Sequence, residues 1–129
     1  MAPDPRRARG ELGERIAERH LTQRGFEVLD RNFRTRYGEI DLVAADESCI
    51  VFCEVKTRVA GGRTGPASGI DAIGPSKRRK LRTMAKAWLR DRPPSSGRPH
   101  RDLLRFDAIG VTLSASGALL SVEHVPDAF

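Results

Sequence analysis

Apolar positions in the first part of the chain recur with the spacing of a helix. Four of them fall on one arc at about 100° per residue. They are Leu12, Ile16, Ala17 and Leu21. Gly25 follows, and glycine commonly ends a helix. The pattern predicts an amphipathic helix over residues 8–24, preceded by a flexible N-terminus at residues 1–8.

Five other segments alternate apolar and polar residues with the period of a β-strand. They span residues 26–34, 38–45, 49–58, 103–113 and 118–125. The polar turn Asp46-Glu47-Ser48 joins the second segment to the third. We therefore expect three strands directly after the first helix and two more near the end of the chain.

A second helical stripe lies between these two groups of strands, with apolar residues at i, i+3, i+4, i+7 and i+8. The stripe consists of Leu81, Met84, Ala85, Trp88 and Leu89. Ser76 is expected to cap this helix, which should end near Asp91 before a pair of prolines. Residues 59–76 are rich in glycine and residues 92–101 in proline and serine, so both are predicted to be loops.

The order of these elements is α-β-β-β-α-β-β, which predicts an α/β fold with a mixed sheet of about five strands flanked by two helices. Residues 1–129 should form one domain, because 129 residues with 39% hydrophobic content support a single modest core. The chain shows no membrane span and no apolar signal-peptide region. We therefore expect a cytoplasmic protein without a membrane partner.

The distribution of charge favours an anionic partner. The net charge is +6, and all 23 lysines and arginines lie at or before Arg105. Residues 37–55 contain none of them. That segment instead carries Glu39, Asp41, Asp46, Glu47 and Glu54. A basic chain with one acidic segment is typical of a phosphate-binding surface around a cation site, so we expect nucleic acid as the partner.

The two cysteines, Cys49 and Cys53, lie four residues apart on one expected strand. That spacing separates them by roughly 13 Å, which is too far for a disulfide. Thiols on an apolar strand usually behave as small apolar residues. We therefore interpret both as core residues, and the absence of Cys/His clusters argues against structural zinc.

Asp41, Glu54 and Lys56 interrupt otherwise apolar strands, where unpaired charges are costly. Strand residues alternate between faces, so Glu54 and Lys56 share one face. A turn with an even number of residues, such as four from Asp46 to Cys49, places Asp41 opposite Glu54 and calls for a cation between them. An odd turn or a bulge would place Asp41 and Glu54 on opposite faces. In the alternative interpretation, Asp41 is a solvent-side residue of an edge strand, and Glu54 and Lys56 form an ion pair along one strand.

Carboxylates of this kind are the ligands that Mg²⁺ or Mn²⁺ prefers. Glu14 lies at the edge of the buried arc of the first helix, so it is a candidate third or water-mediated ligand. We therefore predict Glu14, Asp41 and Glu54 as metal ligands. Asp41, Glu54 and Lys56 are then the predicted catalytic residues of a phosphodiester-hydrolysing site.

Several motifs occur in order along nearly the whole chain. They are GxxGExxA at 10–17, RNFR at 31–34, GEIDL at 38–42, VFCEVKTR at 51–58, Lys77, RFD at 105–107 and HVPDAF at 124–129. In these motifs the chain resembles the YraN family, small bacterial proteins of the PD-(D/E)XK nuclease-like superfamily. The resemblance implies a core similar to Holliday junction resolvases and restriction endonucleases. It also implies Asp41, Glu54 and Lys56 as the active-site trio, with Glu14 as the helix-borne carboxylate.

The start of the second helix carries a cluster of cations that we predict as the nucleic-acid track or, alternatively, as a solvated face. The cluster consists of Lys77, Arg78, Arg79, Lys80, Arg82 and Lys86. Lys77 either reaches the site or extends into solvent. Asp107 is either a buried partner of an arginine or a support for the site, and His20 is interpreted as a core histidine. Tyr37, Phe33 and Trp88 are scattered, so no base-stacking platform is predicted.

The leading hypothesis is an Mg²⁺-dependent endonuclease that acts on DNA, including structured or branched DNA. The first alternative is a non-catalytic nucleic-acid-binding protein that retains the nuclease fold. A third possibility is a small scaffold that binds an acidic protein. The sequence leaves open the choice of DNA or RNA, and whether the chain forms a homodimer as two-strand cutters of this superfamily often do.

Overall fold

The computed structural model describes residues 4–61 and 75–129. Its elements are α1(Pro5–Gln23), β1(Glu27–Thr35), β2(Gly38–Ala45), β3(Cys49–Val59), α2(Pro75–Asp91), the short 3₁₀ helix η1(Pro94–Ser96), β4(Leu103–Leu113) and β5(Leu119–Val125). The α-β-β-β-α-β-β order and the open sheet of five strands confirm the predicted fold class. No helix in the described ranges is long and apolar enough to cross a membrane.

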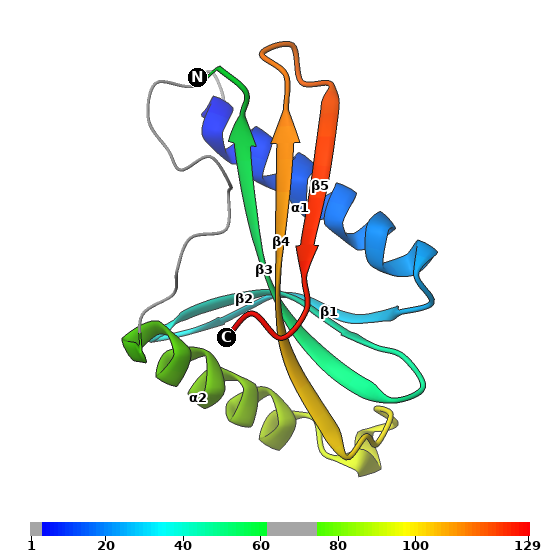
Figure 1. Ribbon diagram of the computed structural model, residues 1–129. Coiled ribbons are helices and arrows are strands. Elements are labelled where there is room, and N and C mark those ends of the chain that lie inside the picture. The colour runs from blue at the N-terminus through cyan, green and yellow to red at the C-terminus, as the bar shows by residue number, and fades with distance from the viewer. Residues whose placement is uncertain (1–3, 62–74) are drawn as a thin grey trace.

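The sheet has the strand order β1-β2-β3-β4-β5. Neighbouring strands are antiparallel except β3 and β4, which run parallel. A parallel pair needs a long crossover connection, and α2 lies within it. Figure 1 shows α1 behind the upper parts of β3, β4 and β5, with α2 beside the β1–β2 hairpin.

Alternation along β3 divides the core into two clusters on opposite faces of the sheet. Ile50 and Phe52 pack with α2 residues, including the fully buried Trp88. Val51 and Cys53 pack on the other face with α1 residues, including the fully buried Leu21. Because a helix covers each face, the middle strands are apolar on both sides.

The register of β2 and β3 agrees with the predicted even turn. Their pairing runs from Ala45–Ile50 to Leu42–Cys53. The turn is held by the Asp46 carboxylate, whose Oδ1 accepts hydrogen bonds from the Ser48 amide at 2.8 Å and the Cys49 amide at 2.9 Å. A short aspartate side chain commonly stabilises a turn in this way.

The start of each helix differs from the predicted one. Helix α1 begins at Pro5, so residues 5–8 are helical and not a flexible terminus. The Asp4 side chain caps this helix by accepting from the Arg6 amide, and proline is favoured in a first turn. Helix α2 begins at Pro75, so Ser76 lies inside the helix and does not cap it.

The two ends of the predicted loop at 59–76 belong to regular elements, because β3 extends to Val59 and α2 begins at Pro75. Residues 62–74 of this predicted loop lie outside the described residues. The predicted loop at 92–101 contains the 3₁₀ helix η1 between α2 and β4.

Cys49 and Cys53 are free, buried thiols in the cluster on the α1 side, as predicted. Burial raises the pKa of the Cys49 thiol and raises that of Cys53 well above its ordinary range. Both side chains therefore remain neutral members of the apolar core.

Candidate functional site

The predicted catalytic residues and metal ligands line one pocket of about 640 Å³. Its walls come from α1, the β1–β2 turn, the adjoining parts of β2 and β3, and the start of α2. The charged residues of the lining are Glu14, Glu39, Asp41, Glu54, Lys56, Lys77 and Lys80. The fold thus brings acidic and basic side chains from four elements to one place.

Asp41 lies one residue beyond the last β2–β3 pair, Leu42–Cys53. Its side-chain Oδ2 accepts a hydrogen bond from the Val55 amide at 2.7 Å. The carboxylate thereby satisfies a strand amide that would otherwise need a carbonyl partner. This bond holds Asp41 between the two strands, and the residue is only 8% exposed.

Glu14, Glu39 and Asp41 form the tightest acidic group of the pocket. Each offers a carboxylate oxygen, and these oxygens all lie within 4.8 Å of one another. Burial raises the pKa of Asp41, the hydrogen bond from the Val55 amide lowers it, and Glu14 and Glu39 raise it again, so that it reaches about 7. Burial also raises the pKa of Glu14. Such a group is unfavourable when fully ionised, so a bound cation would stabilise it.

Glu54 is not a member of that close group within the described part of the chain. Its Oε1 forms an ion pair with Lys77 Nζ and lies 3.9 Å from Lys56 Nζ. Its Oε2 is buried and has no hydrogen-bond partner among the described residues. The predicted pair of Asp41 and Glu54 therefore shares a pocket, but the strand pairing ends before the two residues meet.

The donor set fits a hard divalent cation. Carboxylate oxygens are the ligands that Mg²⁺ and Mn²⁺ prefer, and Mg²⁺ usually takes only one or two of them from the protein. Glu14, Glu39 and Asp41 supply more than that number. The unpartnered Oε2 of Glu54 is a further acceptor in the same pocket.

Close packing of α1 on β3 positions Glu14. Gly13 is buried against Thr57, and a Cβ atom at position 13 would overlap the Thr57 side chain. Only glycine allows the helix backbone to approach the strand this closely. The next residue, Glu14, then lines the pocket, which gives a physical reason for the Gly-Glu pair in the first motif.

Two residues in or beside this site, Glu39 and Asn32, did not stand out in the sequence. Glu39 lies two positions before Asp41 on β2. Because residues i and i+2 of a strand share one face, this spacing was the signal that could have identified Glu39. Asn32 hydrogen-bonds Glu14 and has a left-handed φ of 52°. Asparagine tolerates this backbone conformation better than most residues, and strained residues often lie at functional sites.

The predicted nucleic-acid cluster divides into parts with different surroundings. Lys77 and Lys80 line the pocket. The Lys77 side chain contacts Glu54, so it reaches the site and does not simply extend into solvent. The Arg82 guanidinium lies 5.2 Å from the centre of the Phe106 ring. Arg78 and Arg79 are exposed on α2.

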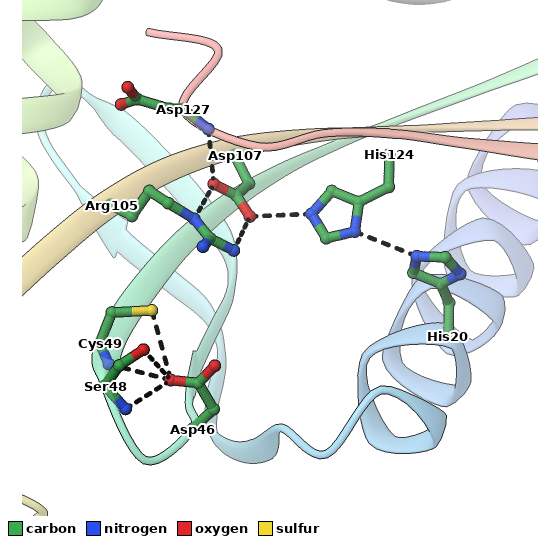
Figure 2. Close-up of polar contacts among 8 residues, drawn as sticks. All are labelled: His20, Asp46, Ser48, Cys49, Arg105, Asp107, His124 and Asp127. Carbon is green, nitrogen blue, oxygen red and sulfur yellow. Dashed lines mark hydrogen bonds and ion pairs between the residues drawn. The ribbon is translucent and has the colours of Figure 1, made fainter.

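Asp107 belongs to a separate buried network, shown in Figure 2. It is fully buried and accepts bonds from Arg105 Nε at 2.8 Å, His124 Nε2 at 2.8 Å and the Asp127 amide at 2.9 Å. His124 Nδ1 in turn lies 3.0 Å from His20 Nε2 on α1. Asp107 is therefore the buried partner of an arginine, one of its two predicted roles, and it links β4, β5 and α1.

The fold and the pocket define a class of protein: a small α/β protein with an open mixed sheet and an acidic pocket between its two helices. The model of a family described as "Uncharacterised protein family UPF0102" matches residues 13–111. The chain belongs to this family, which is the YraN family that its motifs indicated.

Relatives with the same family designation match nearly the whole chain. A UPF0102 protein of Rhodococcus jostii is 46% identical over 122 residues, which cover 95% of this chain and 96% of the relative. One from Frankia casuarinae is 43% identical with the same coverage. One from Anaeromyxobacter dehalogenans is 40% identical over 129 residues, covering 98% of this chain and 87% of the relative.

Proposed function

We propose that this protein is a divalent-metal-dependent endonuclease that hydrolyses phosphodiester bonds in DNA, including structured or branched DNA. The observation that supports the proposal is the pocket itself. It combines three carboxylates whose oxygens lie within 4.8 Å of one another with three lysines. The anionic group suits a cation, and the lysines suit the phosphate of a nucleic acid.

Glu14, Glu39 and Asp41 are the proposed ligands of Mg²⁺ or Mn²⁺, with Glu54 as an additional acceptor. The bound metal supplies Lewis acidity for phosphodiester hydrolysis. The raised pKa of Asp41 means that a proton competes with the metal for this carboxylate near neutral pH. Metal affinity should therefore rise as the pH increases through about 7.

Lysine side chains perform the substrate-binding part of this function. The side chain of Lys56 is 58% exposed at the pocket and can contact a non-bridging phosphate oxygen. Lys77 contacts Glu54 and fixes the orientation of that carboxylate. Lys80 lies one helical turn from Lys77 and also lines the pocket, so it can bind a neighbouring phosphate.

Cleavage of branched and linear DNA in Mg²⁺ or Mn²⁺ tests this proposal. Asp41→Asn, Glu54→Gln and Lys56→Ala should each reduce cleavage by about 100-fold or more, because each removes a charge from the reacting centre. Binding of the same DNA in EDTA should be largely retained. Glu47→Gln is the matched control, since Glu47 is exposed in the β2–β3 turn and does not line the pocket.

Two other outcomes identify the alternatives. Salt-dependent DNA binding without cleavage of a broad DNA and RNA panel indicates a non-catalytic nucleic-acid-binding protein. Absence of salt-dependent binding to any nucleic acid overturns both hypotheses and leaves the acidic-protein scaffold. Mn²⁺ titration of the parent and Glu39→Gln tests the cation site separately from cleavage, and equal affinities would contradict the proposed ligand set.

A further inference from the structure

A second pocket adjoins the carboxylate pocket and has a volume of about 550 Å³. It lies between the end of β1, the β1–β2 turn and the middle of α2. Tyr37 and Met84 line both pockets, so the two spaces are contiguous at these residues. A chain-like substrate that occupies one pocket therefore meets the other.

Positive charge dominates the lining of this second pocket. Arg34, Arg36, Lys86 and Arg90 are its cations, and Asp91 is its acidic residue. Arg34 and Arg90 have acidic partners, Glu39 at 3.3 Å and Asp91 at 3.9 Å. Within the described ranges no carboxylate forms an ion pair with Arg36 or Lys86, which leaves these two cations for an anionic ligand.

Tyr37 supplies an aromatic surface where the two pockets meet. Arg36 lies over its ring, with the guanidinium carbon 4.9 Å from the ring centre, and also donates to the phenol oxygen at 2.7 Å. The tyrosine nevertheless remains 43% exposed. An exposed ring beside cations that form no ion pair with a described carboxylate is a combination that binds unpaired bases and their phosphates.

We propose that this second pocket binds an unpaired nucleotide adjacent to the phosphodiester in the carboxylate pocket. The base stacks on Tyr37, and the flanking phosphates contact Arg36 and Lys86. Bases within a duplex are already stacked, so the ring selects nucleic acid with a single-stranded segment at the target, such as a flap, a loop or a branch point. This inference rests on the proposed function and adds its substrate class.

Binding of a fluorescein-labelled oligothymidylate, measured by anisotropy in EDTA over a range of salt concentrations, tests the proposal. Tyr37→Leu should weaken binding by about tenfold without changing the salt dependence, because it removes stacking and no charge. Arg36→Gln and Lys86→Gln should each weaken binding and lower the salt slope by about 0.7. Arg19→Gln, on the exposed side of α1, is the charge-matched control and should change only the weak non-specific binding.

Photo-cross-linking provides a second measurement. An oligonucleotide containing 5-iododeoxyuridine should cross-link to the peptide that includes Tyr37, and mass spectrometry identifies the site. Asp41→Asn should keep both the binding and the cross-link, since it alters only the carboxylate pocket. The same substitution separates this inference from the proposed cleavage activity.

The possible results lead to different conclusions. If Tyr37→Leu, Arg36→Gln and Lys86→Gln bind the oligonucleotide as tightly as the parent while the parent still cleaves DNA, the proposed nucleotide-binding pocket is wrong and the endonuclease proposal stands. If binding depends on Tyr37 and Arg36 but no DNA is cleaved, the pocket is supported and the catalytic proposal fails. Binding of a polyglutamate peptide through the same residues, without binding of the oligonucleotide, overturns the inference in favour of an acidic protein.

Discussion

Asp41 shows how the site and the stability of the fold oppose each other at a single residue. It is buried, accepts the Val55 amide, and lies close to two glutamates. Burial raises its pKa from 3.8 to about 7. Without a cation, the folded protein either keeps this carboxyl protonated or carries a buried charge. Both states lower the free energy of unfolding at neutral pH, where the unfolded chain ionises the same group freely.

We expect Asp41→Asn to stabilise the metal-free protein by about 1–3 kcal/mol near pH 8. The folded parent binds one more proton than the unfolded chain between pH 3.8 and about 7, so its stability falls as the pH rises through that window. The asparagine does not titrate and its amide oxygen still accepts the Val55 amide. Urea unfolding in EDTA at several pH values measures the difference.

Added Mn²⁺ should stabilise the parent and leave Asp41→Asn largely unchanged. Asp91→Asn, an exposed substitution on α2, is the control and should show no comparable pH trend. A mutant at position 41 that is less stable than the parent near pH 8 would contradict this explanation of the raised pKa.

At the scale of elements, the contact of α1 with β3 through Gly13 determines where Glu14 lies. Gly13→Ala should lower the free energy of unfolding by about 1–3 kcal/mol, because the new methyl group overlaps Thr57. It should also weaken Mn²⁺ binding by moving Glu14. Urea unfolding and Mn²⁺ titration check the two effects.

Gly10→Ala is a matched control on the same helix, because a Cβ atom there meets nothing within 4 Å. It should stabilise the helix by about 0.5–1 kcal/mol. Adding Thr57→Ala to Gly13→Ala removes two of the three overlapping atoms and should recover part of the loss. Equal effects of the two glycine substitutions would show that the close approach does not matter.

The hydrogen-bonded network around Asp107 should stabilise the packing of β4, β5 and α1 against one another. Burial alone would raise the pKa of Asp107, but hydrogen bonds from His124, Arg105 and the Asp127 amide lower it below 3.8. Asp107→Asn should lower the free energy of unfolding by about 3 kcal/mol at neutral pH, because it leaves the positive charge of Arg105 without its buried carboxylate partner.

The effect of Asp107→Asn should depend on pH in a defined direction. The ionised carboxylate contributes its full stability above 3.8, and the parent loses that contribution as the pH falls through the lower pKa of the folded state. The difference in unfolding free energy between parent and mutant should therefore shrink under acid conditions. A difference that stays constant down to about pH 2 would argue against an ionised Asp107.

The sequence predicted most helices and strands because their apolar periods are local. It did not predict the parallel pairing of β3 and β4, since strand order depends on contacts across the whole sheet. It also gave no sign of the contact between His20 and His124, which lie 104 residues apart. In the site, Asp41, Glu54 and Lys56 stood out as charges within apolar strands, whereas Asn32 depends on a left-handed backbone that no local pattern indicated.

At the scale of the whole molecule, the described residues form two apolar clusters that share one sheet. Damage to either face should therefore unfold both together, as in a two-state domain. Leu21→Ala, on the α1 side, should lower stability by about 2–4 kcal/mol. It should shift the unfolding midpoint seen by fluorescence of Trp88, which is fully buried on the other face and is the only tryptophan in the chain.

Far-UV circular dichroism measured on the same samples should give a midpoint that coincides with the fluorescence midpoint. Arg19→Ala, an exposed change on α1, should leave both midpoints where they are. If Leu21→Ala shifts the dichroism signal and leaves the Trp88 transition unchanged, the two faces unfold separately.

Because Cys49 and Cys53 are buried, their reactivity can report local unfolding of the protein. A thiol-specific reagent should reach them when a fluctuation exposes the apolar cluster that they share with α1 residues. The rate of labelling in the native protein would therefore report the free energy of that opening without any denaturant. For the same reason, a cysteine introduced at an exposed position such as Arg79 would react first and carry a fluorophore without removal of the native thiols.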